Sequence, residues 1–137
     1  MILIDSNIMI DVLGDDQSWQ EWSVNQLDML SDQGGLFVNQ IVYAEVAPRL
    51  GSLDEFAARL DSFEIEFLPF AEDASFAAGS AFLTYRNRRE SARLVLPDFF
   101  IGGHAQALGA TILTRDPRFY RAYFPSVPLI TPENPHQ

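Results

Sequence analysis

Short apolar runs alternate along the chain with longer stretches in which apolar residues recur at the spacing of an α-helix. The short runs predict β-strands at residues 1–4, 36–39, 64–70, 110–114 and 127–132. The longer stretches predict helices over residues 7–13, 18–33, 40–47, 51–63, 71–89 and 96–108, followed by a helical turn within residues 115–124. Apolar strands that alternate with helices are typical of an α/β fold, in which helices cover both faces of a central parallel sheet.

Particular residues indicate where these helices begin and end. Asn39 can cap the helix over residues 40–47, and Pro48 must end or kink that helix. Ser52 and Glu55 have the spacing of a capping box for the helix that follows.

The predicted helix over residues 96–108 contains two adjacent glycines and a histidine. Gly102 and Gly103 each cost a helix about 1 kcal/mol relative to alanine, so we expect them to allow close approach to a strand or a substrate. At about 100° per residue, His104 lies about 120° around the helix from Asp98. We therefore expect His104 to be structural and not a partner of Asp98 in a site.

The sequence has no internal repeat, low-complexity tract or linker, which predicts one domain over residues 1–132 and a frayed tail over residues 133–137. No apolar run approaches the roughly 20 residues that cross a membrane. The start of the chain lacks the basic and apolar regions of a signal peptide. With no cysteine, the chain has neither disulfides nor thiolate metal sites, and we expect a cytoplasmic protein.

The formal net charge is −10, from nineteen acidic residues and nine basic ones, all of them arginine. This balance argues against non-specific binding to a polyanion, because phosphate contacts normally require a basic surface. A role with nucleic acid would need cations from metal ions, a partner or a local cluster. Such a cluster occurs at Arg86, Arg88, Arg89 and Arg93, which could equally be a solvated helix end.

Four acids stand out because they interrupt or border apolar segments: Asp5, Glu45, Asp98 and Asp116. Two of them follow predicted strands closely, at the edge of a parallel sheet where ligands usually bind. A carboxylate in apolar surroundings faces a desolvation cost unless it is paired or bound to a cation.

Each of the four acids also has an ordinary structural explanation. Asp5 or Ser6 could cap the following helix, and Glu45 could pair with Arg49 four residues later. Asp98 suits the first turn of its helix, and Asp116 could begin an Asp-Pro turn. Taken together, however, the four acids suggest a carboxylate cluster for a hard divalent ion such as magnesium or manganese, which prefers oxygen ligands. Such a site can lower the pKa of a bound water and neutralise charge on a phosphate.

The segments "MILIDSNIMIDVL", "VNQIVYAEVA", "LPDFFIGGHAQALGATILTRDPRFY" and "VPLITP" resemble the PIN-domain nucleases, and most closely the VapC-type toxins of toxin–antitoxin pairs. The similarity runs from residue 2 to about residue 132. It implies a three-layer α/β/α sandwich with a central parallel sheet. It also implies an endoribonuclease that hydrolyses RNA phosphodiester bonds with Mg²⁺ or Mn²⁺, by a metal-activated water held among carboxylates.

The resemblance assigns catalytic roles to Asp5, Glu45, Asp98 and Asp116, with Asp5, Asp98 and Asp116 as metal ligands. Ser6, Asn7 and Thr114 match supporting positions of the family, and Arg86, Arg89 and Arg93 could contact RNA phosphates. Many relatives carry a further acid where this chain has Arg118 and Phe119, which leaves the number of metal ions open.

The resemblance further implies a homodimer silenced by a cognate antitoxin, and a basic inhibitor segment would suit the acidic charge. Large apolar residues beyond the needs of a small sheet could be covered by a second copy or by an antitoxin helix; these are Trp19, Trp22, Met29, Tyr43 and Phe56.

Two other kinds of function remain open from the residues alone. One is an acidic-site phosphohydrolase of another α/β fold, but the aspartate expected two residues after Asp5 is Asn7. The other is a non-catalytic module, either PIN-like or receiver-like. A receiver requires a lysine late in the chain, and this chain has none.

Overall fold

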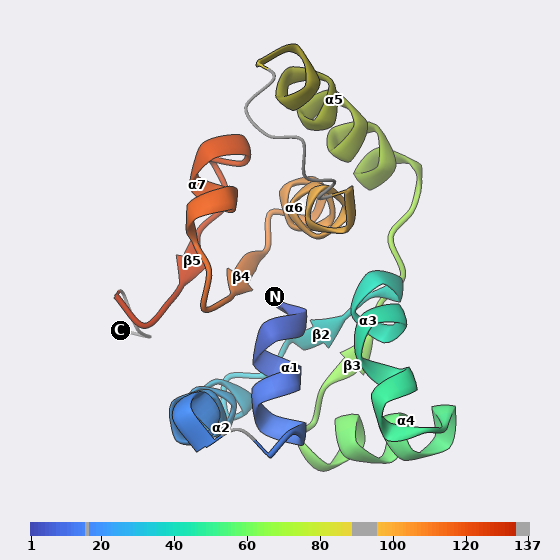
Figure 1. Ribbon diagram of the computed structural model, residues 1–137, viewed down its shortest axis with the longest axis vertical. Coiled ribbons are helices and arrows are strands. Elements are labelled where there is room, and N and C mark those ends of the chain that lie inside the picture. Colours follow the sequence, from blue (N-terminus) through green and yellow to red (C-terminus); the bar gives the residue numbers. More distant parts are fainter. Residues whose placement is uncertain (16, 89–95, 134–137) are drawn as a thin grey trace.

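The computed structural model describes residues 1–15, 17–88 and 96–133, whose strands form one five-stranded sheet (Figure 1). All neighbouring strands are parallel, in the order β3-β2-β1-β4-β5. The strands are β1 (Ile2–Ile4), β2 (Leu36–Val38), β3 (Glu66–Phe67), β4 (Thr111–Leu113) and β5 (Leu129–Ile130). The strand predicted over residues 64–70 is shorter than expected. It lies at the edge of the sheet, where Leu68 N–H still bonds to the Val38 carbonyl oxygen, but the next N–H on that side, of Phe70, bonds to the Gln40 side chain instead.

Seven helices flank the sheet within the part of the chain that the structure describes. They are α1 (Ser6–Leu13), α2 (Gln17–Ser31), α3 (Gln40–Leu50), α4 (Leu53–Ser62), α5 (Glu72–Arg88), α6 (Leu96–Leu108) and α7 (Arg118–Tyr123). Figure 1 shows α1 and α2 on one side of the strands and α5 and α6 on the other. The predicted α/β class with a central parallel sheet is therefore confirmed.

The two central strands are apolar because helices cover both of their faces. Leu3 and Ile4 of β1 and Ile112 and Leu113 of β4 are fully buried, and Ile4 is paired with Leu113. Each such side chain contributes about 1.5–3 kcal/mol through burial. This packing fixes β1 and β4 side by side, so the residues that follow each strand emerge at the same edge.

Local capping follows the sequence closely, with one exception. Asn39 Oδ1 accepts hydrogen bonds from the N–H groups of Ile41 and Val42, and Ser52 Oγ accepts one from Glu55 N–H. Pro48, however, does not end α3, which continues to Leu50. The helix stops at Gly51, whose φ of 88° is the left-handed conformation that favours glycine.

Gly102 and Gly103 serve packing between protein elements, not approach to a strand or substrate. A Cβ on Gly103 would lie 2.7 Å from the Ala74 carbonyl oxygen and 2.7 Å from the Ala78 nitrogen, both in the backbone of α5. A Cβ on Gly102 would lie 2.2 Å from the Phe124 ring. The glycines let α6 approach α5 and the segment after α7 more closely than any other residue allows.

Gly103→Ala is therefore expected to destabilise the protein by about 1–3 kcal/mol, because the added methyl group meets rigid backbone. Gly79→Ala is the matched control, since Gly79 lies inside α5 and a Cβ there meets nothing within 4 Å. The control should gain about 0.5–1 kcal/mol from helix propensity. Urea denaturation of both variants measures the difference. Equal effects at the two sites would contradict the packing assignment.

His104 is a buried structural residue, as its position on the helix predicted. Its Nδ1 lies 3.0 Å from Asn39 Nδ2. Because Asn39 Oδ1 already accepts the two capping bonds of α3, the Asn39 amide must donate through Nδ2. His104 Nδ1 is then an acceptor, so the ring is neutral and carries its proton on Nε2.

Burial lowers the pKa of His104 below its ordinary value of 6.5, and the charge of Asp73 opposes this shift. A lowered pKa means that stability is complete above pH 6.5 and is lost as the pH falls toward the folded pKa, because only the unfolded chain takes up the proton. His104→Gln removes this titration. The stability advantage of the wild type over the variant should shrink between about pH 7.5 and about pH 5, by at most about 1.4 kcal/mol per pH unit. Urea denaturation at both pH values measures this, and a constant difference would contradict a neutral His104.

None of the helices that the structure describes combines the length and the apolar character needed to cross a membrane. Of the predicted frayed tail, only Glu133 lies within the described residues, and its carboxylate pairs with Arg121 at 3.2 Å.

Candidate active site at the edge of the sheet

The carboxyl ends of β1 and β4 bring together residues that are far apart in the sequence. Asp5 follows β1, and Thr114 and Asp116 follow β4. The backbone N–H of Asp5 donates to the Leu113 carbonyl oxygen at 3.0 Å, which continues the pairing of the two strands. The carboxyl edge of a parallel sheet is where ligands bind in open α/β folds.

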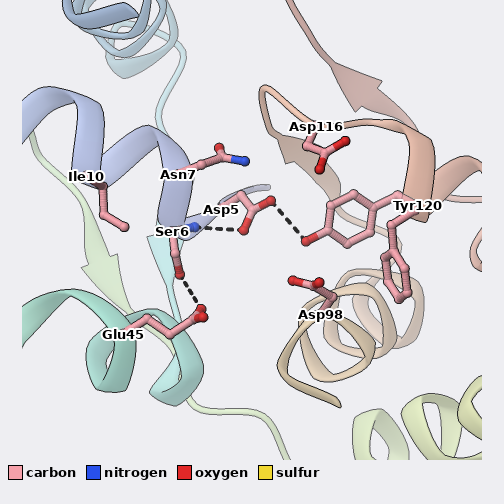
Figure 2. A pocket seen from close by; sticks show the side chains of 9 residues that line it. Asp5, Ser6, Asn7, Ile10, Glu45, Asp98, Asp116 and Tyr120 are labelled. Carbon is pink, nitrogen blue, oxygen red and sulfur yellow. Dashed lines mark hydrogen bonds between the residues drawn. The ribbon is translucent and has the colours of Figure 1, made fainter. Parts of the chain in front are cut away.

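Helices α3 and α6 bring the other two predicted acids to this edge. Asp98 lies in the first turn of α6, and Glu45 lies in the second turn of α3. All four acids line one pocket of about 220 Å³, enough for several water molecules at about 30 Å³ each. This acidic pocket is lined by Asp5, Ser6, Asn7, Ile10, Glu45, Asp98, Asp116, Phe119 and Tyr120. Figure 2 shows Asp98 and Asp116 facing Asp5 from the opposite wall.

Asp5 is the most constrained of the four acids. Its Oδ1 accepts the Ser6 N–H at 2.8 Å, which caps α1, and its Oδ2 accepts the hydroxyls of Thr114 at 2.8 Å and Tyr120 at 3.0 Å (Figure 2 draws the Ser6 and Tyr120 bonds). Burial raises the pKa of Asp5, and the Glu45 charge adds to this, whereas the three hydrogen bonds lower it. Asp5 thus caps a helix and also points a fixed carboxylate into the acidic pocket.

The Glu45 carboxylate is held by Ser6, whereas the partner that the sequence suggested for it was Arg49. Its Oε1 accepts the Ser6 hydroxyl at 2.6 Å (Figure 2). Arg49, the possible partner one turn later, donates to the backbone carbonyl of Glu45. Ser6 therefore joins two of the acids, because its N–H holds Asp5 and its hydroxyl holds Glu45.

Thr114 and Asn7 link the loop after β4 to α1. Thr114 Oγ1 donates to Asp5 Oδ2 and accepts the Asp116 N–H at 3.0 Å and Asn7 Nδ2 at 3.3 Å. Asn7 Oδ1 accepts the Arg115 N–H at 3.3 Å. The three residues predicted to support the acids thus all contact them or the loop that carries Asp116.

The expected desolvation of all four acids is wrong for three of them. Asp5 is 6% exposed, but Asp98 is only half-buried, and Glu45 and Asp116 are exposed. Their apolar sequence neighbours face other directions. In α3, for example, Val46 is buried while Glu45 faces the acidic pocket.

The donor set of the acidic pocket fits a hard divalent ion in its chemistry. Four carboxylates line it, and none of the lining residues is basic. Such a cluster repels itself unless a cation is present. Among the described residues, however, no three Asp, Glu or His side chains lie close enough together to hold an ion. Asp5 and Glu45 accept hydrogen bonds from hydroxyl groups instead, so the side chains of Glu45, Asp98 and Asp116 must rotate toward the fixed Asp5 carboxylate before the acids can share an ion.

Tyr120 is the main pocket residue that the sequence did not single out. Its side chain is 2% exposed, and its hydroxyl donates to Asp5. Burial, followed by the charges of Asp5 and Asp98, raises the pKa of Tyr120 well above its usual value, so the hydroxyl stays protonated as a donor. Phe119 and Ile10 supply apolar wall. These three residues lie in ordinary apolar patterns, and only the folded chain shows that they reach the pocket.

The predicted phosphate-binding arginines are described only in part. Arg86 and Arg88 are exposed in the last turn of α5, whereas Arg89 and Arg93 lie outside the described residues. Arg88 lies over the ring of Tyr123, with its Cζ 5.6 Å from the ring centroid. The end of α5 is thereby placed against α7, the helix that carries Tyr120.

Several solved structures share this fold. VapBC2 from Rickettsia felis, bound to a promoter DNA fragment, matches with a TM-score of 0.74 and 22% identity over 96% of this chain and 98% of that one. DNA-bound VapBC from Salmonella typhimurium matches with a TM-score of 0.71 and 17% identity over 95% and 96%. A toxin–antitoxin complex from Klebsiella pneumoniae matches with a TM-score of 0.64 and 19% identity over 98% and 99%.

At these identities the solved structures show a common fold and nothing more. A comparison with curated protein sequences finds no match. The family model described as the PIN domain matches residues 2–125, which is most of the chain and includes the four acids, Ser6, Asn7, Thr114 and Tyr120. The resemblance seen in the sequence is thereby confirmed, and the chain belongs to the PIN domain family.

Proposed function

We propose that the protein is a Mg²⁺- or Mn²⁺-dependent endoribonuclease, the toxin of a toxin–antitoxin pair. The observation that carries the proposal is the convergence of Asp5, Glu45, Asp98 and Asp116 on one pocket without a basic lining residue. The family match and the fold shared with VapBC complexes support it. The sheet order 3-2-1-4-5 also differs from the 2-1-3-4-5 order of receiver modules, which argues against that alternative.

In this proposal, Asp5, Asp98 and Asp116 hold the metal ion. The bound ion supplies positive charge that neutralises the scissile phosphate and acidifies a water molecule. Thr114 and Tyr120 keep the Asp5 carboxylate ionised and oriented through their hydroxyls. Ser6 holds Glu45 at the pocket wall, where its exposed carboxylate can accept a proton from the attacking water.

The partner proposed for this protein is an antitoxin that brings basic residues to the acidic pocket. A net charge of −10 favours association with a basic segment. We also propose a homodimer. Of the apolar residues considered for such contacts, Trp19 and Met29 are 37% and 44% exposed, whereas Phe56 is fully buried in the core. Phe76 and Leu83 of α5, 79% and 58% exposed, are further candidates for a covered surface.

The experiment that tests the function is RNA mapping after induced expression, with and without coexpression of any small DNA-binding protein that is encoded beside this gene. Growth arrest with new RNA 5′ ends, relieved by coexpression, would support the toxin. The purified protein, incubated with RNA and DNA of one sequence in Mg²⁺, Mn²⁺ or EDTA, tests substrate and metal. Intact RNA in both experiments would leave a non-catalytic PIN-like binding module as the better assignment.

Phosphate contacts by Arg86, Arg89 and Arg93 form a separate prediction. Replacing all three by glutamine should weaken RNA binding and flatten its dependence on salt, by about one counterion for each lost contact. Arg59→Gln is the control, because Arg59 is exposed on α4 and carries the same charge. Fluorescence anisotropy across a salt series, with Ca²⁺ in place of Mg²⁺, measures the slope. A slope equal to that of the control would mean that the cluster is solvated surface.

A further inference from the structure

Arg115 stands between Thr114 and Asp116, yet its guanidinium does not line the acidic pocket. Arg115 Nε donates to Asp11 Oδ2 at 2.5 Å, and Arg115 Nη2 donates to Asp11 Oδ1 at 2.9 Å. The pair is therefore bidentate, the geometry that fixes both groups most rigidly. A guanidinium held in this way is committed to α1 and is not available as a phosphate ligand.

Asp11 is buried and bonds to α2 as well as to Arg115. It is 5% exposed, and the buried Ser23 of α2 donates to its Oδ2 at 2.8 Å. The guanidinium carbon of Arg115 lies 5.2 Å from the centroid of the Trp19 ring, also on α2. The pair thus ties the loop after β4 to both α1 and α2.

The backbone of Arg115 is held as well, and from the same helix. Its N–H donates to Asn7 Oδ1 at 3.3 Å. Asn7 and Asp11 are four residues apart on α1, so they lie one above the other on one helix face. Arg115 is consequently fixed at its main chain and at the tip of its side chain. The loop that carries Asp116 cannot move relative to α1, which begins directly after Asp5, without breaking these bonds.

We propose that Asp11 and Arg115 form a positioning pair that sets Asp116 at the correct place relative to Asp5. This inference rests on the proposed function, because its purpose is to prepare the acids for a divalent ion. A buried ion pair is a weak source of stability, since desolvation offsets most of the attraction. Orientation of a neighbouring ligand is a better reason to keep one, and residues that orient metal ligands typically affect metal affinity about 10- to 100-fold.

The test measures Mn²⁺ binding by electron paramagnetic resonance in Arg115→Gln, in Asp11→Asn and in the double variant. Each single variant should bind Mn²⁺ about 10- to 100-fold more weakly than the wild type. The double variant should be no weaker than the worse single one, because the two residues act as one unit. Arg121→Gln is the matched control. It removes an arginine from the exposed Arg121–Glu133 pair, outside the lining of the acidic pocket, and should leave Mn²⁺ binding unchanged.

A second measurement does not depend on metal or activity. Amide hydrogen exchange at Arg115 and Asp116, whose N–H groups bond to Asn7 and Thr114, should accelerate in Arg115→Gln and not in Arg121→Gln. If Arg115→Gln does not fold, Arg115→Lys keeps the charge but loses the bidentate fork, and the same losses are expected. Circular dichroism identifies the folded variants.

The outcomes separate this inference from the proposed function. A wild type that binds Mn²⁺ but cleaves no RNA would refute the proposed nuclease function. The positioning pair would then be tested by the Mn²⁺ affinities of its variants alone. A wild type that does not bind Mn²⁺ leaves it to be judged on amide exchange. Folded variants with unchanged Mn²⁺ affinity would show that the pair does not position the acids. Unchanged exchange where no Mn²⁺ binds would show that the pair does not hold the loop. Either result would overturn the inference.

Discussion

Asp98→Asn and Asp116→Asn should each slow RNA cleavage by about 100-fold or more, because each removes a proposed metal ligand, and a reacting group misplaced by even 1 Å can react about 100-fold more slowly. Asparagine keeps the size of each side chain but removes a negative charge from the acidic pocket. Because Asp98 is half-buried and Asp116 is exposed, the folded structure should be retained. Cleavage of a labelled RNA by purified protein, with circular dichroism of each variant, measures both effects.

The control for these variants is Asp28→Asn. Asp28 is exposed on α2 and does not line the acidic pocket. Replacing it by asparagine changes the net charge by the same amount as each pocket variant does. Its cleavage rate should equal that of the wild type. Normal cleavage by both pocket variants would remove Asp98 and Asp116 from the catalytic machinery. An equal loss in Asp28→Asn would instead indicate a general effect of charge.

The features that the sequence predicted well are those fixed within a few residues. The caps at Asn39 and Ser52 each depend on N–H groups two or three positions away, so composition and spacing were enough. The order of strands and helices follows from apolar periodicity for the same reason. Pro48 does not end α3, because a proline in the last turn removes only one bond, and Gly51 decides where the helix ends.

The features that could not be predicted depend on pairs of residues far apart in the chain. Arg115 and Asp11 are separated by 104 positions, and Tyr120 and Asp5 by 115, so no local pattern connects them. The acids themselves were found because each stands beside a strand or an apolar helix. Their exposure was not predicted, since a helix can bury Val46 and leave the adjacent Glu45 at the surface.

Asp5→Asn should have opposite effects on activity and on stability. Cleavage should be lost, because Asp5 is a proposed metal ligand and its carboxylate is the one that Ser6, Thr114 and Tyr120 orient by hydrogen bonds. In EDTA at neutral pH the variant should be more stable than the wild type. Asparagine caps helices as well as aspartate does, and its amide can donate to the Tyr120 hydroxyl; the Thr114 oxygen already accepts from Asp116 and Asn7 and loses only the bond that it donates.

The stability gain of Asp5→Asn should depend on pH in a defined direction. Burial raises the pKa of Asp5 above its ordinary value of 3.8. An acid with a raised pKa destabilises the folded state only while it is ionised, so the cost is complete above the folded pKa and absent below about pH 3.8. The variant should therefore lose its advantage as the pH falls. Asp5→Ala, which also leaves the two hydroxyls and the helix start without an acceptor, should be destabilised by about 1–3 kcal/mol.

Metal should reverse the order of stability between Asp5→Asn and the wild type. A ligand at 100 times its dissociation constant stabilises the protein that binds it by about 2.7 kcal/mol. Saturating Mn²⁺ should therefore raise the melting temperature of the wild type and leave that of Asp5→Asn nearly unchanged. Thermal melts with EDTA and with Mn²⁺ give the comparison. If Asp5→Asn is the less stable protein in EDTA, Asp5 is primarily structural. If Mn²⁺ stabilises both proteins equally, the ion does not bind through Asp5. Either result would count against the acidic pocket as a metal site.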